Sequence, residues 1–92
     1  MQFDIPIVYF IFNRPDCTKK SFSIIRNQKP KKLFIISDGP RVQNFNDKEK
    51  CKECLEIVNQ IDWPCDVKTN YSNINLGMKE RNITGLNWAF SF

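Results

Sequence analysis

Three runs of strand-forming residues recur along the chain, and each ends in a polar turn. Ile5–Phe12 and Leu33–Ile36 are apolar at consecutive positions, whereas Asp66–Tyr71 alternates in polarity. A continuous apolar run predicts a strand buried on both faces, and alternation predicts a half-buried strand or one near an edge. We therefore place Ile5–Phe12 at the centre of a parallel sheet, with Pro6 at its start because proline lacks an N–H.

The segments between and after these runs have apolar residues at helical spacing. The first predicted helix covers about Asp16–Gln28, and the second begins near Asn46 or Asp47, either of which is a plausible N-cap. A third helix begins at about Met78, after a polar loop. The apolar positions of the second and third helices are Cys51, Cys54, Leu55, Val58 and Ile61, and then Ile83, Leu86, Trp88 and Phe90.

This order of elements predicts the fold class. A β-α-β-α-β-α chain favours an α/β fold with a parallel sheet and right-handed crossovers. We expect residues 1–92 to form one partial Rossmann-like, three-layer domain. A G-x-G-x-x-G motif, a Walker A motif and histidine are all absent from the sequence, which excludes the usual dinucleotide and P-loop phosphate cradles and any His-dependent nucleophile.

The composition and charge of the chain limit the class of protein and its expected location. The 92 residues are 41% hydrophobic with a net charge of +4, which suits a packed domain that tolerates an anionic ligand. No signal peptide is recognisable, and the longest apolar run is too short to cross a bilayer. We expect a cytoplasmic protein, free or peripheral to a membrane, without a transmembrane segment and without nucleic acid as a partner. The cysteines Cys51 and Cys54 form a CxxC inside a helix, where small core residues are favoured over a redox pair or half a zinc site.

Ligands of open parallel sheets bind beyond the carboxyl ends of the strands. Three polar loops should meet at that edge: Asn13–Asp16, Ser37–Pro40 and Asn73–Gly77. Asp38 directly follows a buried strand and precedes Gly39, which allows close backbone approach. Its carboxylate could accept a uracil or thymine imide N–H or a ribose hydroxyl; alternatively, it could cap its own turn.

Cationic and helix-terminal groups could complete such a site. Arg14 and Arg81 could bind phosphate oxygens through paired hydrogen bonds, and Lys79 could act as a point charge. Asn75 and Gly77 precede a helix, where free backbone N–H groups favour an anion. The alternatives are solvated surface cations and an ordinary helix-initiating turn.

Taken together, these segments resemble family 2 glycosyltransferases. Pro6–Pro15 resembles the family's opening strand, which ends in an Asn-Arg pair, and Ile35–Gly39 resembles its Asp-Asp-Gly-Ser segment, with Ser37 in place of the first Asp. Asn75–Arg81, with Gly85 beyond, resembles the Asn-x-Gly loop and the following helix.

The resemblance implies a GT-A fold and a transferase that uses a nucleotide-diphospho-sugar such as a UDP-sugar. The implied nucleotide-binding residues are Phe12, Asn13, Arg14, Asp38, Gly39, Asn75, Gly77, Lys79 and Arg81. Mg²⁺ or Mn²⁺ would be bound in the full-length enzyme by an Asp-x-Asp motif on a fourth strand. That motif and the catalytic base are not in this chain, so we expect it to carry only the N-terminal, nucleoside-binding half and to be inactive alone.

Two other functions stay open at the sequence level. One is a nucleotide-binding module without catalysis, and the other is a self-assembling α/β module. A partial sheet has open strand edges and uncovered apolar surface, so we also expect the chain to form a homo-oligomer.

Overall fold

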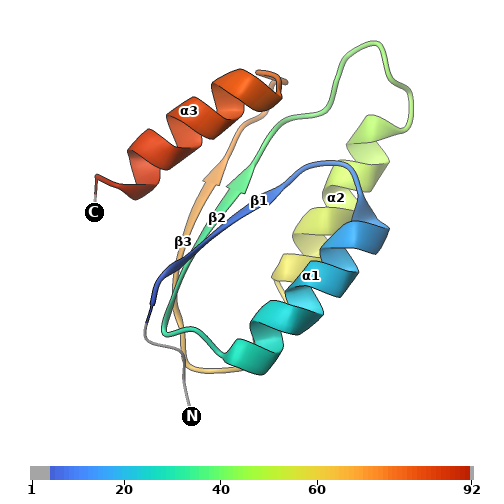
Figure 1. Ribbon diagram of the computed structural model, residues 1–92. Coiled ribbons are helices and arrows are strands. Elements are labelled where there is room, and N and C mark those ends of the chain that lie inside the picture. Colours follow the sequence, from blue (N-terminus) through green and yellow to red (C-terminus); the bar gives the residue numbers. More distant parts are fainter. Residues whose placement is uncertain (1–4, 92) are drawn as a thin grey trace.

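Parallel strands form the middle layer of the structure, a computed structural model that describes residues 5–91 (Figure 1). The strands β1 (Ile7–Ile11), β2 (Lys32–Ser37) and β3 (Asp66–Tyr71) lie in the order β1-β2-β3. Ile7 pairs with Leu33 in β2, which sets the register of β1. Together with three helices the strands make the predicted β-α-β-α-β-α arrangement, so the α/β, partial Rossmann-like prediction is confirmed.

The centre of this sheet is β2. Its residues Leu33 to Ile36 are at most 5% exposed, because helices cover both faces and a strand lies on each side. The prediction that Ile5–Phe12 lies at the centre is wrong for the described residues, in which β1 is an edge strand and Phe10 is 37% exposed. Apolar runs indicate burial but do not specify how many strands flank them.

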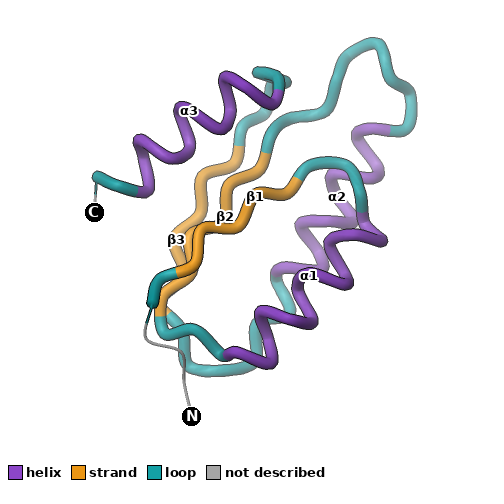
Figure 2. The backbone as a smooth tube through the Cα atoms, viewed as in Figure 1, coloured by secondary structure: helices purple, strands orange, loops and turns teal. Residues whose placement is uncertain are grey.

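The helices α1 (Pro15–Gln28) and α2 (Asp47–Val58) cover one face of the sheet (Figure 2). The core beneath them contains Leu33 and Ile35 of β2 together with Cys54, which is fully buried. This environment agrees with the prediction that the helical cysteines are small core residues. Ile61 lies beyond the end of α2 but still packs against the core.

The helix α3 (Met78–Ala89) lies on the opposite face, which completes the three layers (Figure 1). Trp88 meets Phe34 edge to face with ring centroids 5.7 Å apart. Gly85 brings the helix backbone close to the sheet, since a Cβ there would lie 2.8 Å from the Ile36 side chain. Ala89 is also buried, whereas Met78, Ile83 and Leu86 of this helix and Phe90 just beyond its end are exposed.

The structure contains no candidate for a membrane-spanning helix. Within residues 5–91, none of the helices combines the length and the apolar character that crossing a bilayer requires.

Candidate functional site

The loops that follow β2 and β3 meet at the carboxyl edge of the sheet, as predicted. Asp38, directly after β2, lies 7% exposed and faces the loop that leads from β3 to α3. The backbone N–H of Gly39 donates to the Ile74 carbonyl at 3.2 Å, which adds a direct link between the two loops. The Asp38 carboxylate therefore organises this part of the edge, although its partners in the loop after β3 lie 37 or more residues away in sequence.

Each oxygen of the Asp38 carboxylate accepts two hydrogen bonds. Oδ1 accepts the backbone N–H of Gly39 and of Leu76, both at 2.9 Å. Oδ2 accepts the Asn75 amide and the backbone N–H of Gly77, both at 3.1 Å. The buried charge is thus compensated by four donors, as a carboxylate out of water requires.

This arrangement corrects the prediction of free N–H groups ahead of the third helix. The anion at the start of α3 is the protein's own Asp38, which takes up the N–H groups of Leu76 and Gly77. Gly77 adopts φ +84°, a conformation that glycine reaches without steric cost, and so turns the chain into the helix. The Asn75 amide also donates to the Gly39 carbonyl at 2.9 Å, so it keeps a partner if it leaves Asp38.

Arg81 has a different position from the one that a phosphate ligand would need. It is 5% exposed, and its Nε donates to the Ser37 carbonyl at 3.0 Å. Its guanidinium also donates to the Asn70 carbonyl and side-chain oxygen. The guanidinium thus joins α3 to the ends of β2 and β3, and burial lowers its pKa from the ordinary value. Lys79 and Arg14 are exposed.

A second buried carboxylate, Asp47, organises the neighbouring part of the edge. It is 1% exposed and accepts the Asn13 amide at 2.9 Å and the Arg41 guanidinium at 2.7 and 3.1 Å. The backbone N–H of Arg41 also donates to it at 3.0 Å. These hydrogen bonds, led by those from the Arg41 side chain, hold the pKa of Asp47 well below its usual range, although burial opposes the shift.

The same arginine reaches the loop after β1. Its guanidinium carbon lies 5.7 Å from the centroid of the Phe12 ring, within the range of a cation–π interaction. Phe12 and Asn13 are therefore connected to the first turn of α2 through Arg41 and Asp47. The helix N-cap itself is Asn46, which makes no side-chain capping hydrogen bond.

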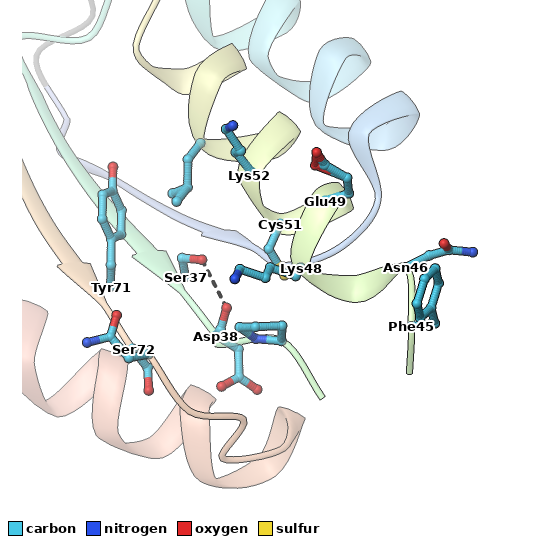
Figure 3. A pocket seen from close by; sticks show the side chains of 13 residues that line it. Ser37, Asp38, Phe45, Asn46, Lys48, Glu49, Cys51, Lys52, Tyr71 and Ser72 are labelled. Atoms are coloured by element: carbon cyan, nitrogen blue, oxygen red, sulfur yellow. Dashed lines mark hydrogen bonds between the residues drawn. The ribbon is translucent and has the colours of Figure 1, made fainter. Parts of the chain in front are cut away.

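An open cavity of about 780 Å³ lies between α2 and the carboxyl ends of β2 and β3 (Figure 3). Lys48 and Lys52 of α2 form one wall, and Tyr71 lies on the opposite side. Ser37 and Asp38 contribute to the lining, but the Asp38 carboxylate points away from α2, toward the start of α3 (Figure 3). The cavity offers aromatic and cationic groups together, a combination that suits a flat anionic ligand.

The predicted nucleotide-binding residues do not line a single cavity. Asn13 and Arg14 line a separate depression of about 610 Å³ with Lys50 and Glu53 of α2. Asn75 lines a third, of about 560 Å³, on the Arg41 side of the loop. The carboxyl edge thus gathers the predicted loops while dividing their side chains among neighbouring depressions.

Metal-binding and thiol chemistry have little support in the described part of the chain. No cluster of three or more His, Cys, Asp or Glu side chains able to hold a metal ion occurs among residues 5–91. Asp38 and Asp47 do not fit a metal either, because N–H donors surround both carboxylates. Burial raises the pKa of Cys51 to about 11, so at neutral pH this thiol stays protonated and unreactive.

Sequence reasoning missed the cavity wall and the roles of Arg41 and Asp47. Arg41 directly follows the Ser37–Pro40 turn, and this position next to a candidate site was the available signal. Lys48 and Lys52 are four residues apart, which places them on one face of a helix, and this spacing was the available signal for the cavity wall. Comparison with protein-family models, with curated proteins and with solved structures finds no match to this chain.

Proposed function

We propose that this chain carries the nucleoside-binding half of a glycosyltransferase that uses a nucleotide-diphospho-sugar donor. The observation that carries the proposal is Asp38, a buried carboxylate at the carboxyl end of the central strand that organises the loop after β3. Ligands of open parallel sheets bind at this edge. The resemblance of Asp38 and Asn75–Arg81 to family 2 glycosyltransferase segments supplies the reaction class.

In this proposal Asp38 recognises the base through its carboxylate. An N–H group of the base replaces the Asn75 amide as the hydrogen-bond donor to that carboxylate. The Asn75 amide can release Oδ2 because it retains the Gly39 carbonyl as acceptor. A uracil or thymine imide N–H then takes its place on the carboxylate. Cytosine presents an unprotonated ring nitrogen there, and two facing acceptors would cost about 1–3 kcal/mol.

Lys48 and Lys52 supply positive charge for the anionic part of the ligand. Both line the cavity next to Asp38, and both lie on the exposed side of α2. Arg14 and Lys79, also exposed, are further candidates from the sequence. Arg81 acts in the proposal by holding the ends of β2 and β3 in place, since its guanidinium already binds carbonyl oxygens.

The proposal assigns no catalytic step to this chain. Mg²⁺ or Mn²⁺ would neutralise charge on the leaving diphosphate in the complete enzyme. The carboxylates at this edge are committed to protein donors, so the metal ligands would have to come from residues outside those described.

Titration with UDP and UDP-glucose, followed through backbone amide chemical shifts, tests the proposal. We expect the largest shifts at Ser37–Gly39 and Asn73–Gly77, with saturation at millimolar ligand, about 4 kcal/mol of binding free energy. Asn75→Ala should alter these shifts. The control Asp62→Asn, at an exposed carboxylate paired with Arg26 away from the site, should leave them unchanged. Absent shifts, or shifts confined to other elements, would exclude this function.

One observation favours a second candidate, a self-assembling module in which Asp38 is purely structural. The carboxylate has four donors in the protein already, as a turn-organising residue would. The same titration separates the two, because a structural Asp38 predicts no response to either nucleotide.

A further inference from the structure

Arg41 has hydrogen-bond donors that its protein partners do not use. Its Nε and Nη2 groups donate to the Asp47 carboxylate at 2.7 and 3.1 Å. A guanidinium carries five N–H donors, and the remaining ones have no hydrogen-bond partner within residues 5–91. The side chain is 49% exposed, whereas that of Asp47 is 1% exposed. The buried carboxylate therefore holds one side of the guanidinium and leaves the Nη1–Nη2 side for a ligand.

The position of this guanidinium is set before any ligand binds. The Phe12 ring lies against it, with 5.7 Å between the guanidinium carbon and the ring centroid. The backbone of Arg41 is fixed as well, since its N–H donates to Asp47 at 3.0 Å and its carbonyl accepts the N–H of Asn44 at 3.2 Å. A side chain that is already ordered loses little conformational entropy when it binds.

Arg41 lies on the same side of the loop after β3 as the proposed base contact. It lines the depression of about 560 Å³ that Asn75 also lines. The Asn75 amide is the donor to Asp38 that a base would replace. Lys48 and Lys52 line a different cavity, on the side of α2 from which the Asp38 carboxylate points away (Figure 3). Arg41 is therefore the cation that shares a depression with the residue at the base contact.

We propose that Arg41 binds a phosphate group of the nucleotide, an inference that rests on the proposed nucleotide site. The free Nη1–Nη2 side can donate two parallel hydrogen bonds to phosphate oxygens while the other side stays on Asp47. Because Asp47 balances the charge of Arg41, the attraction depends on the direction of these N–H groups more than on net charge. A lysine at this position keeps the charge but lacks the planar pair of donors.

Titration of the wild type and of Arg41→Lys with UDP and with uridine, followed through amide chemical shifts, tests the inference. We expect Arg41→Lys to weaken UDP binding about tenfold, since it loses hydrogen bonds to a charged group. At a fixed uridine concentration the shifts at Ser37–Gly39 should be equal in the two proteins, because uridine has no phosphate. Arg26→Lys is the matched control, since Arg26 also pairs with an aspartate, Asp62, and should keep the wild-type affinity for UDP.

Inorganic pyrophosphate separates this inference from the proposed function, because it carries phosphates without a base. In the wild type we expect it to shift the Nε–H signal of Arg41 and the amides of residues 41–44. This response together with unperturbed loops in the presence of uridine and UDP would exclude the nucleoside site and leave a phosphate site at Arg41. UDP that binds equally well to the wild type and to Arg41→Lys would leave the nucleoside site and exclude the role of Arg41.

Two results would overturn the inference. One is an unchanged affinity for UDP in an Arg41→Lys variant that is folded by circular dichroism. The other needs no variant: pyrophosphate shifts in the wild type that map to Lys48 and Lys52 and leave the Arg41 Nε–H signal in place would assign the phosphates to the α2 cavity.

Discussion

Asp38 and Asp47 are both buried carboxylates, and both accept four hydrogen bonds, but they serve different parts of the carboxyl edge. Asp38 joins the loops after β2 and β3 through backbone N–H groups and one amide. Asp47 joins the start of α2 to Asn13 and Arg41 through side chains and a single backbone N–H. A ligand can displace a side-chain donor more easily than a backbone donor that forms part of a turn. The Asn75 amide is therefore the replaceable partner of Asp38.

The dependence of folding stability on pH, below neutral pH, tests the role of Asp47. Its folded-state pKa lies below the unfolded value of about 4 because Arg41 and Asn13 hydrogen-bond to the ionised form. Its contribution to stability is complete above the unfolded pKa and is lost as pH falls toward the folded pKa. We expect Asp47→Asn to lower the melting temperature by several degrees at pH 7, with the difference from wild type shrinking below about pH 4.

Thermal unfolding of both proteins from pH 7 to pH 2.5 measures this difference. Asp62→Asn is the control, because Asp62 and its partner Arg26 are about half exposed and an exposed pair adds little to stability. A destabilisation by Asp47→Asn that stays constant over the whole pH range would mean that the charge of Asp47 does not matter.

At the scale of elements, close backbone approach fixes the arrangement of loops around the sheet. A Cβ at Gly39 would lie 2.5 Å from the backbone of Ile74, in the loop after β3. A Cβ at Gly85 would instead meet the Ile36 side chain at 2.8 Å and the Phe10 ring at 3.1 Å. Side chains can shift more readily than the backbone of a hydrogen-bonded loop.

We therefore expect Gly39→Ala to destabilise the protein more than Gly85→Ala. It should cost about 1–3 kcal/mol through overpacking, whereas Gly85→Ala combines a smaller clash with the gain of about 1 kcal/mol in helix propensity. Urea unfolding of the two variants gives the comparison. A larger loss for Gly85→Ala would show that α3 packs on the sheet more rigidly than the two loops pack on each other.

The elements themselves could be predicted from hydrophobic pattern. The strand Asp66–Tyr71 and the helix start at Met78 are confirmed as predicted, because turn residues and proline mark their limits. The position of β1 was wrong, since an apolar run does not reveal which strand is central. The third helix was expected from apolar residues that prove largely exposed, while Arg81 and Gly85 face the sheet.

The candidate site was predictable as a set of loops but not as a set of contacts. Topology brings the ends of parallel strands to one edge, so Asp38 and Asn75 could be expected near each other. Which groups satisfy a buried carboxylate depends on backbone geometry that the sequence does not specify. The N–H group of Gly77 was expected to be free, but it binds Asp38.

At the scale of the whole molecule, the proposed site occupies one end of the sheet. The carboxyl edge holds the buried carboxylates and the cavity lined by Lys48 and Lys52. β1 lies at one edge of the described sheet, with β2 between it and β3 (Figure 2).

Base discrimination at Asp38 is the most direct test of the central claim. Amide chemical-shift titrations with UDP and with CDP, on the wild type and on Asp38→Asn, measure it. The account predicts shifts at Ser37–Gly39 and Asn73–Gly77 with UDP, at least about tenfold weaker binding of CDP, and loss of that preference in a folded Asp38→Asn variant. Equal responses to the two nucleotides in the wild type, or a UDP preference that survives in Asp38→Asn, would contradict it.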